Sequence, residues 1–360
     1  VLSPTFSIDV GIDAEYTEGE LLQYQTGETE GAAFLVETVP VGEHYNYDVN
    51  ATLVAPFTAL TWHQDDWKLS LGARYEQMHY DYTNNMIAGR TRDDGTTCGF
   101  GGCRYSRPES AENTFHNFSP KFNASYQYSD QVQFYGGVSR GYRAPQATEL
   151  YRLQREQQVA DLDSVTATNY EVGVKGKTQQ GRYVLSLYRM LKDNVIYRNS
   201  DFFNVNDGET LHQGVELTVN HGLSDKLSLD FAGTYARHTY EHSQLLGEVD
   251  IQGNVIDTAP KVQTNTRLRY VFSDAVTSEL EWQYVSRYFT DAENLNEYEG
   301  HHLLHARIHY ALSSKVSLFA RINNLLDVNY AERADFTSFS GPRYFPGRPR
   351  NVMLSVSLVL

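Results

Sequence analysis

Arginine and tyrosine side chains gather in one short stretch before the middle of the chain. The residues are Arg140, Tyr142, Arg143, Tyr151 and Arg152. A guanidinium group binds carboxylates through two parallel hydrogen bonds and also stacks on aromatic rings. This combination suits an anionic, aromatic ligand that chelates a metal ion, so we expect ligand binding here. The alternative is that these arginines only brace the base of a loop.

The two cysteines of the chain are the second group that could carry chemistry. Cys98 and Cys103 enclose a glycine-rich segment, Cys-Gly-Phe-Gly-Gly-Cys, inside a long polar stretch. In an oxidising compartment such a close pair predicts a small disulfide ring. A metal site would need further ligands, and His116 is the one candidate nearby. We therefore expect a disulfide that stiffens the tip of a loop.

Signals of catalysis are weak. The sequence contains no His-Glu-x-x-His motif and no phosphate-binding loop. His301 and His302 are adjacent, and neighbouring residues of a strand point to opposite faces, so together with His305 they indicate interface histidines rather than paired metal ligands. We expect no enzymatic activity, no resident metal ion and no cofactor.

Charge and hydropathy exclude two classes of protein. The net charge of -15 argues against binding to nucleic acid, which selects basic surfaces. No apolar run approaches the roughly 18 residues of a membrane helix. Alternating β-strands remain possible, because their lipid-facing residues are hidden in hydropathy averages. The chain starts Val-Leu-Ser-Pro without Met or signal peptide, and we expect it to be cut from a longer protein.

Apolar residues recur at every second position along most of the chain. Residues 6–16 alternate in this way, and residues 52–62 and 67–75 form a hairpin around a tight turn at 64–66. Each strand has roughly the 9–11 residues that cross a bilayer at a tilt. Counting such segments gives about 14 strands. The last strand, 351–360, places Leu354, Val356 and Leu358 on one face.

The connections alternate between short and long. Short turns are predicted at 64–66, 129–130, 224–225, 273–274 and 313–314, and long polar loops near 83–113, 142–165, 242–259, 290–300 and 327–347. This asymmetry is typical of outer-membrane β-barrels. Aromatic residues near strand ends predict girdles at the membrane boundary; they are Tyr75, Tyr80, Tyr82, Tyr126, Tyr128, Tyr270, Trp282, Tyr288 and Tyr310.

Several motifs resemble those of one family. Arg-Ile-Asn-Asn-Leu-Leu-Asp at 321–327, Tyr330 and the Gly-Arg-Pro-Arg segment at 347–350 resemble the C-terminal signature of TonB-dependent outer-membrane receptors. Gly-Tyr-Arg-Ala-Pro at 141–145 and Asn-Tyr-Glu-Val-Gly-Val-Lys at 169–175 resemble barrel segments of the siderophore-receptor type. Such barrels end in Phe or Trp, whereas this chain ends in Leu.

The resemblance implies an all-β transmembrane antiparallel barrel in the outer membrane of a Gram-negative bacterium. It implies about 22 strands around a plug, so residues 1–360 would be the C-terminal barrel portion, without the plug, the TonB box and the first strands. The implied partners are the TonB–ExbB–ExbD complex, an extracellular metal chelate and outer-membrane lipid. The implied activity is energised uptake, most often of a ferric siderophore.

Charged residues of both signs occupy the face of the strands opposite the lipid. They are Arg74, Glu76, Glu216, Asp230, Arg267, Arg269, Glu279, Glu281, Arg287 and Arg321. Such a polar lumen is either solvated and salt-bridged or holds the plug.

Two other functions remain open from the residues alone. A passive porin would be a complete barrel without a plug, and a TonB box upstream in the gene would distinguish the two. An outer-membrane protease or lipase would need a nucleophile and a base at the loop end. The ligand class stays open among ferric siderophore, haem, cobalamin and carbohydrate.

Overall fold

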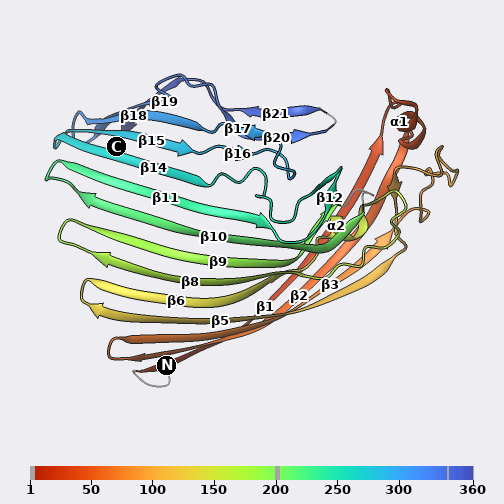
Figure 1. Cartoon of the computed structure of the whole chain (residues 1–360), viewed down its shortest axis with the longest axis horizontal. Coiled ribbons are helices and arrows are strands. Elements are labelled where there is room, and N and C mark those ends of the chain that lie inside the picture. Colours follow the sequence, from red (N-terminus) through yellow and green to blue (C-terminus); the bar gives the residue numbers. More distant parts are fainter. Residues whose placement is uncertain (1–4, 199–202, 339, 360) are drawn as a thin grey trace.

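One curved antiparallel sheet makes up most of the molecule. The computed structural model describes residues 5–198, 203–338 and 340–359. Fourteen strands pair in the order β1-β2-β3-β5-β6-β8-β9-β10-β11-β14-β15-β18-β19-β22, so each long strand neighbours the next long strand along the chain (Figure 1). Short turns join the strands at one end of the sheet, and long loops join them at the other, as the sequence predicts.

The elements have the following bounds. The sheet contains β1 (Phe6–Gln25), β2 (Gly42–Gln64), β3 (Trp67–Asn84), β5 (Ala111–Ser129), β6 (Val132–Arg143), β8 (Val165–Lys177), β9 (Gly181–Arg198), β10 (Asn204–Gly222), β11 (Leu227–Tyr240), β14 (Val262–Ser273), β15 (Val276–Val285), β18 (His301–Ala311), β19 (Val316–Asn323) and β22 (Asn351–Leu358). The loops contain α1 (Ala33–Thr38), α2 (Ala147–Tyr151), β4 (Tyr105–Ser106), β7 (Leu153–Gln154), β12 (Leu245–Leu246), β13 (Val249–Asp250), β16 (Tyr288–Phe289), β17 (Glu297–Tyr298), β20 (Ala331–Thr337) and β21 (Gly341–Pro346). Among the described residues, no helix is long and apolar enough to cross a membrane.

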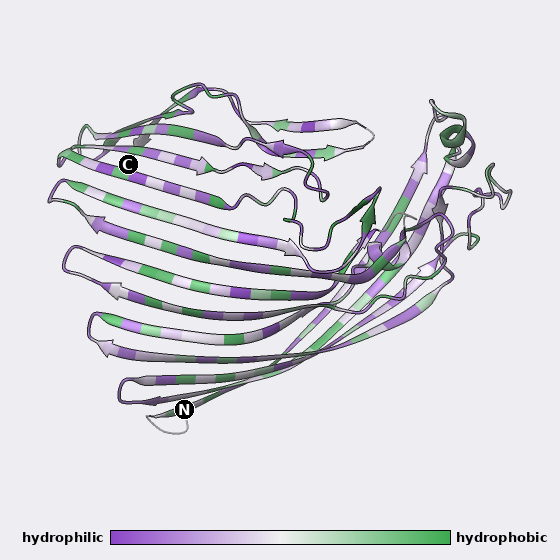
Figure 2. Ribbon diagram, viewed as in Figure 1, coloured by the Kyte–Doolittle hydropathy of each residue, from purple (hydrophilic) through white to green (hydrophobic). Residues whose placement is uncertain are grey.

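Strand alternation gives the sheet an apolar outer face. In register, Ile8 pairs with Leu60, Leu60 with Leu71, Leu71 with Phe122, and Phe122 with Val138. The side chains of this row are apolar, and Leu71 is 54% exposed although it is a leucine in mid-strand. Apolar and polar residues alternate along each strand (Figure 2). Such a face is stable in contact with lipid.

The last strand continues this outer face. Leu354 pairs with Ala320, Val356 with Leu318, and Leu354 is 77% exposed. Ser355 pairs with Phe319 on the opposite face. β1 and β22 are the two edges of the sheet, and no pairing joins them within the described part of the chain.

Three of the predicted girdle residues lie elsewhere. Tyr80, Tyr82 and Tyr288 are 8%, 1% and 8% exposed, because they point to the inner face or into the loop layer. The prediction is wrong for Tyr80 and Tyr82 since β3 extends well beyond the length needed to cross lipid, and for Tyr288 since this residue lies in β16, beyond the end of β15. By contrast, Tyr75, Tyr128, Tyr270, Trp282 and Tyr310 are exposed as a girdle requires.

Two strand boundaries also differ from prediction. β15 ends at Val285, so Arg287 lies outside the barrel wall and its side chain is 73% exposed. The first strand is also longer than the alternating stretch 6–16 indicates, because β1 continues to Gln25 by pairing with β2.

Candidate ligand-binding site

The long-loop end of the sheet carries a buried cluster of tyrosine rings. The cluster contains Tyr45 and Tyr47 of β2, Tyr80 and Tyr82 of β3, Tyr105 of β4 and Tyr151 of α2. The Tyr82 ring stacks on the Tyr151 ring with centroids 4.0 Å apart and planes 9° apart. Since each aromatic pair contributes about 0.5–1.5 kcal/mol beyond area burial, the cluster anchors α2 to the sheet.

Arg107 is the polar centre of the loop between β3 and β5. It is 1% exposed. Its guanidinium donates to four carbonyl oxygens and one hydroxyl, those of Ile87 (2.7 Å), His44 (3.3 Å), Thr91 (2.7 Å to O and 2.9 Å to Oγ1) and Arg92 (3.4 Å). The carbonyl dipoles replace the water that this buried charge loses. Arg107 therefore fixes the path of the loop, although nothing in its sequence neighbourhood marks it.

The disulfide ring lies in the same loop. Cys98 and Cys103 are bonded, with Cα atoms 4.9 Å apart. Arg90 Nε donates to the Cys103 carbonyl at 3.0 Å, and Arg90 also pairs with Glu156 at 2.7 Å. His116 lies on the outer face, where its Nδ1 bonds the Tyr75 hydroxyl at 2.7 Å. Arg90 thus connects the disulfide ring to the loop that follows α2.

Mass spectrometry checks this bond. We expect the non-reduced peptide that contains Cys98 and Cys103 to be lighter by two hydrogens than the reduced peptide. Two thiols that alkylate freely in folded, oxidised protein would show that the bond is absent.

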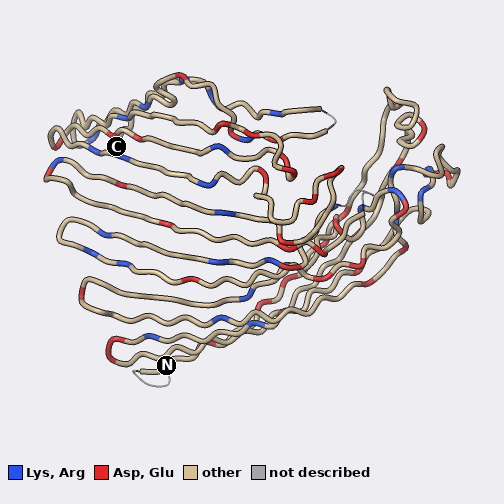
Figure 3. Tube along the Cα trace, viewed as in Figure 1, with Lys and Arg blue, Asp and Glu red and all other residues tan. Residues whose placement is uncertain are grey.

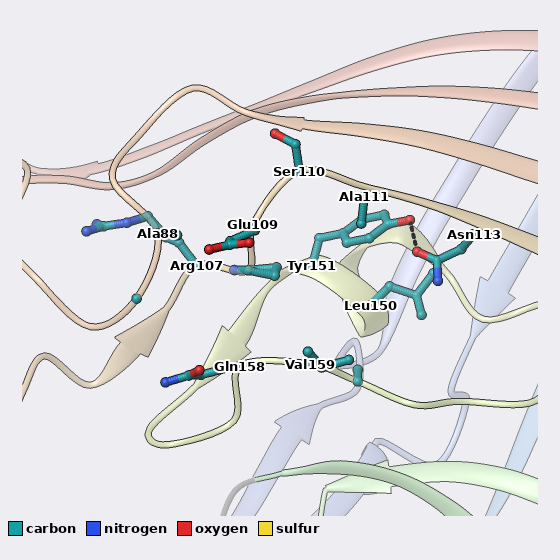
Figure 4. Close-up of a pocket in the computed structure, with 13 residues that line it drawn as sticks. Ala88, Arg107, Glu109, Ser110, Ala111, Asn113, Leu150, Tyr151, Gln158 and Val159 are labelled. Atoms are coloured by element: carbon teal, nitrogen blue, oxygen red, sulfur yellow. Dashed lines mark hydrogen bonds between the residues drawn. The ribbon is translucent and has the colours of Figure 1, made fainter.

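A cavity of about 580 Å³ opens between this loop and α2 (Figure 4). This volume lies within the range of about 300–1,000 Å³ that is usual for ligand pockets. Its lining combines polar and apolar residues: Ala88, Gly89, Arg107, Pro108, Glu109, Ser110, Ala111, Asn113, Leu150, Tyr151, Gln158, Val159 and Ala160. Burial raises the pKa of the Tyr151 phenol, which therefore stays protonated and donates to Asn113 Oδ1 at 2.7 Å.

Three of the five predicted binding residues lie around α2. Tyr151 lines the cavity. Arg143 makes two hydrogen bonds to Glu149, at 2.8 and 3.1 Å, and so its charge is neutralised. Arg152 donates twice to the amide oxygen of Gln23, at 3.1 and 2.8 Å. Because Gln23 is neutral, this contact leaves the charge of Arg152 available.

Arg140 and Tyr142 lie on the other face of β6. They follow Val138 at every second position and therefore share its exposed outer face. The Arg140 guanidinium lies 5.3 Å from the centre of the Tyr142 ring. The structure therefore does not bring this pair together with Arg143 and Tyr151, because odd and even positions of a strand diverge.

The inner face of β14, β15, β18 and β19 carries a charged network centred on Glu281. Glu281 is 4% exposed and accepts hydrogen bonds from Asn265 (2.7 Å), Gln283 (3.2 Å) and Arg307. Arg267 lies 3.6 Å from the same carboxylate. Both signs of charge occur along these strands (Figure 3). The predicted polar lumen thus contains a salt-bridged wall.

The remaining predicted histidines are separated by the register. The ring of His302 stacks on that of Tyr284 with centroids 4.6 Å apart. His305 Nδ1 instead accepts a hydrogen bond from the backbone N–H of Asn324 at 3.2 Å. Within the described residues, no three His, Cys, Asp or Glu side chains are grouped as metal ligands.

The arrangement of strands and loops agrees with one known family. Residues 2–325 match the family model described as TonB dependent receptor-like, beta-barrel. The chain belongs to this family. The apolar face of the receptor barrel therefore contacts outer-membrane lipid, the short turns are periplasmic and the long loops are extracellular.

Curated relatives share sequence with most of this receptor barrel. The Metal-pseudopaline receptor CntO of Pseudomonas aeruginosa (strain UCBPP-PA14) is 23% identical over 82% of this chain and 39% of its own length. The Ferrichrome outer membrane transporter/phage receptor of Escherichia coli (strain K12) is 25% identical over 73% of this chain and 32% of its own length. The chain thus spans well under half the length of these relatives.

Solved structures show the same fold. The ferric yersiniabactin uptake receptor FyuA from Yersinia pestis matches with a TM-score of 0.76 at 16% identity, over 99% of this chain and 51% of its own. The ferric-catecholate import receptor Fiu from E. coli K12, in its closed form, matches with a TM-score of 0.76 at 17% identity, over 99% and 53%. Since large transporters of this type have about 22 strands, the fourteen strands are part of such a barrel, and none of the described residues builds a plug domain.

One stretch of the receptor barrel matches the letters of a catalytic motif. Residues 137–141 read Gly-Val-Ser-Arg-Gly, the pattern of the nucleophile elbow in serine hydrolases. The nucleophile elbow is a sharp turn between a strand and a helix. Here Ser139 lies within β6, paired with Lys121 on one side and Asn169 on the other. The stretch therefore lacks the geometry that the hydrolase chemistry requires.

Proposed function

We propose that this receptor barrel takes up an extracellular metal chelate of the ferric-siderophore type, with energy from TonB–ExbB–ExbD transmitted through a plug. In this proposal, residues 1–360 supply the C-terminal barrel wall and its loops, and the plug lies elsewhere in the protein. The observation that carries it is the 580 Å³ cavity beside Arg107 and Tyr151 at the extracellular end. The names of the relatives, which include a metal-pseudopaline receptor and a ferrichrome transporter, support a chelate as the ligand class.

Ligand capture in this proposal uses Tyr151 and Arg152, assisted by Arg143, whereas Arg140 and Tyr142 are left out because they lie on the outer face of β6. An anionic chelate gains most from a cation that no carboxylate neutralises. Among the residues that the structure describes, Arg152 meets this condition, because its guanidinium contacts the neutral Gln23 and lies 5.9 Å from the centre of the Tyr45 ring. The lumenal network around Glu281 would contact the plug.

Growth on single iron sources tests the uptake function. A strain that lacks the receptor, complemented with the full-length gene, should grow on at least one ferric chelate from a panel of catecholate, hydroxamate and carboxylate types. Growth should require an intact TonB. Uptake that continues without TonB would support a passive channel instead, and no growth difference on any source would contradict the proposal.

Alanine substitutions test the capture residues. In the full-length receptor, Arg152→Ala should weaken binding of the active ferric chelate by about 10- to 150-fold, because a charge-assisted hydrogen bond contributes about 1.5–3 kcal/mol. Arg143→Ala should have a smaller effect, since Glu149 already neutralises Arg143. Arg152→Lys is the matched control that keeps the charge. Equal affinities for wild type and both alanine variants would move the site to other loops.

A further inference from the structure

Two histidines and a methionine form a row across three strands of the inner wall. His212 of β10 is directly opposite His238 of β11 on one side and Met190 of β9 on the other. Leu187, Val215 and Tyr235 on the same three strands face outward. Each is an odd number of residues from the member of the row on its own strand, so strand alternation places all three members of the row on the inner face. Directly opposed side chains have Cβ atoms about 4.5–5.5 Å apart.

The two imidazoles meet through their Nδ1 atoms. The Nδ1 atoms of His212 and His238 lie 2.8 Å apart, and both rings are partly buried. In the metal-free pair, one Nδ1 carries a proton and donates to the lone pair of the other. Two histidine nitrogens that bind one metal ion at about 2.0–2.1 Å likewise point their lone pairs toward a common point. The pair is therefore already assembled for coordination, apart from one proton.

Thr210 contacts the second ring nitrogen of His212. Its Oγ1 lies 3.0 Å from His212 Nε2. When Nε2 carries the proton and donates to this hydroxyl, Nδ1 of His212 presents a lone pair toward His238. A hydrogen bond from the second ring nitrogen is the usual way in which proteins orient a histidine ligand. Metal binding then requires only that the His238 proton move from Nδ1 to Nε2.

We propose that Met190, His212 and His238 form a binding site for a copper ion in the lumen wall. The thioether of Met190 would be the third ligand, and soft thioether sulfur together with imidazole selects copper, in particular Cu(I). Lys192 pairs with Thr210, close enough for its charge to act on both imidazoles. This positive charge repels a dication more than a monocation, which also favours Cu(I). The site needs only three adjacent strands and does not rest on the proposed uptake of a chelate.

Copper titration of the full-length receptor tests the site. Purified protein is titrated anaerobically with Cu(I) in competition with a chromophoric chelator, and X-ray absorption records the sulfur ligand. Met190→Leu and His238→Gln should each weaken Cu(I) binding by more than the about 10–100-fold typical of an outer-shell substitution. Met190→Leu should also abolish the copper–sulfur signal.

His309→Gln is the matched control, because His309 is an exposed histidine of β18 away from this row. It should leave the Cu(I) affinity unchanged. Heat-modifiable migration on gels shows that each variant is folded, and if His238→Gln fails to fold, Met190→Leu still decides the question. An unchanged Cu(I) affinity and an unchanged sulfur signal in Met190→Leu would overturn the proposal, as would an equal loss in His309→Gln.

Discussion

Replacement of Arg107 by methionine is expected to detach the extracellular loop between β3 and β5 from the barrel. Methionine fills a similar volume but donates no hydrogen bond, so the carbonyl oxygens of Ile87, His44 and Thr91 would lose their donor. Each buried polar group left unpaired costs about 1–3 kcal/mol. The free energy of loop unfolding should therefore fall by about 3 kcal/mol or more, a large effect for one substitution.

Limited proteolysis measures this loss in the full-length receptor. Cleavage between residues 85 and 110 should become much faster in Arg107→Met, while the barrel keeps its heat-modifiable migration. The control is Arg92→Met in the same loop, because Arg92 is partly exposed and should change the cleavage rate little. Unaltered cleavage in Arg107→Met would show that the disulfide and the tyrosine cluster hold the loop without this arginine.

The sequence predicts the barrel wall well because lipid imposes a simple rule on it. Every second residue of a spanning strand must be apolar, and the period of two is visible without any knowledge of the partner strand. The alternation of short turns and long loops follows from the same segments. The number of strands, the separation of short turns from long loops and the orientation of Leu354 could therefore be anticipated from residues that are local in sequence.

The extracellular layer could not be predicted in this way. Above the membrane both faces of β2 and β3 contact protein or water, so the lipid rule no longer applies to their residues. Tyr80 and Tyr82 therefore look like girdle residues in the sequence although they point inward. Arg107 resembles any other loop arginine, because its acceptors are backbone carbonyls up to 63 residues away. Adjacency in sequence also suggested one site from Arg140 to Arg152, whereas strand alternation puts Arg140 and Arg143 on opposite faces of β6.

The inner wall shows why charge patterns alone do not identify function. The ten predicted lumenal charges include Glu281 and Arg267, which the structure places in one salt-bridged network. They also include Arg287, which lies outside the strands. Sequence alternation gives the face of a residue but not its height above the membrane, and height decides whether a charge meets the lumen or a loop.

Arginine at Leu354 is expected to destabilise the barrel by about 2–4 kcal/mol, the cost of a charge on the lipid face near the bilayer midplane. Leu354 pairs with Ala320 on the outer face, about midway along a strand that ends near the periplasmic turn before Val316. Val356→Arg should cost less, because Val356 lies two residues nearer that turn and the penalty falls toward the interface.

Ser355→Arg, between these two positions, is the matched control. Ser355 pairs with Phe319 on the inner face, where the guanidinium can reach water or polar groups, so the change should be within about 0.5 kcal/mol. Urea unfolding of the full-length receptor in lipid bilayers gives all three free energies. The order Leu354→Arg, then Val356→Arg, then Ser355→Arg follows from the strand register and from depth. Equal costs at Leu354 and Ser355 would mean that β22 does not present its even-numbered face to lipid.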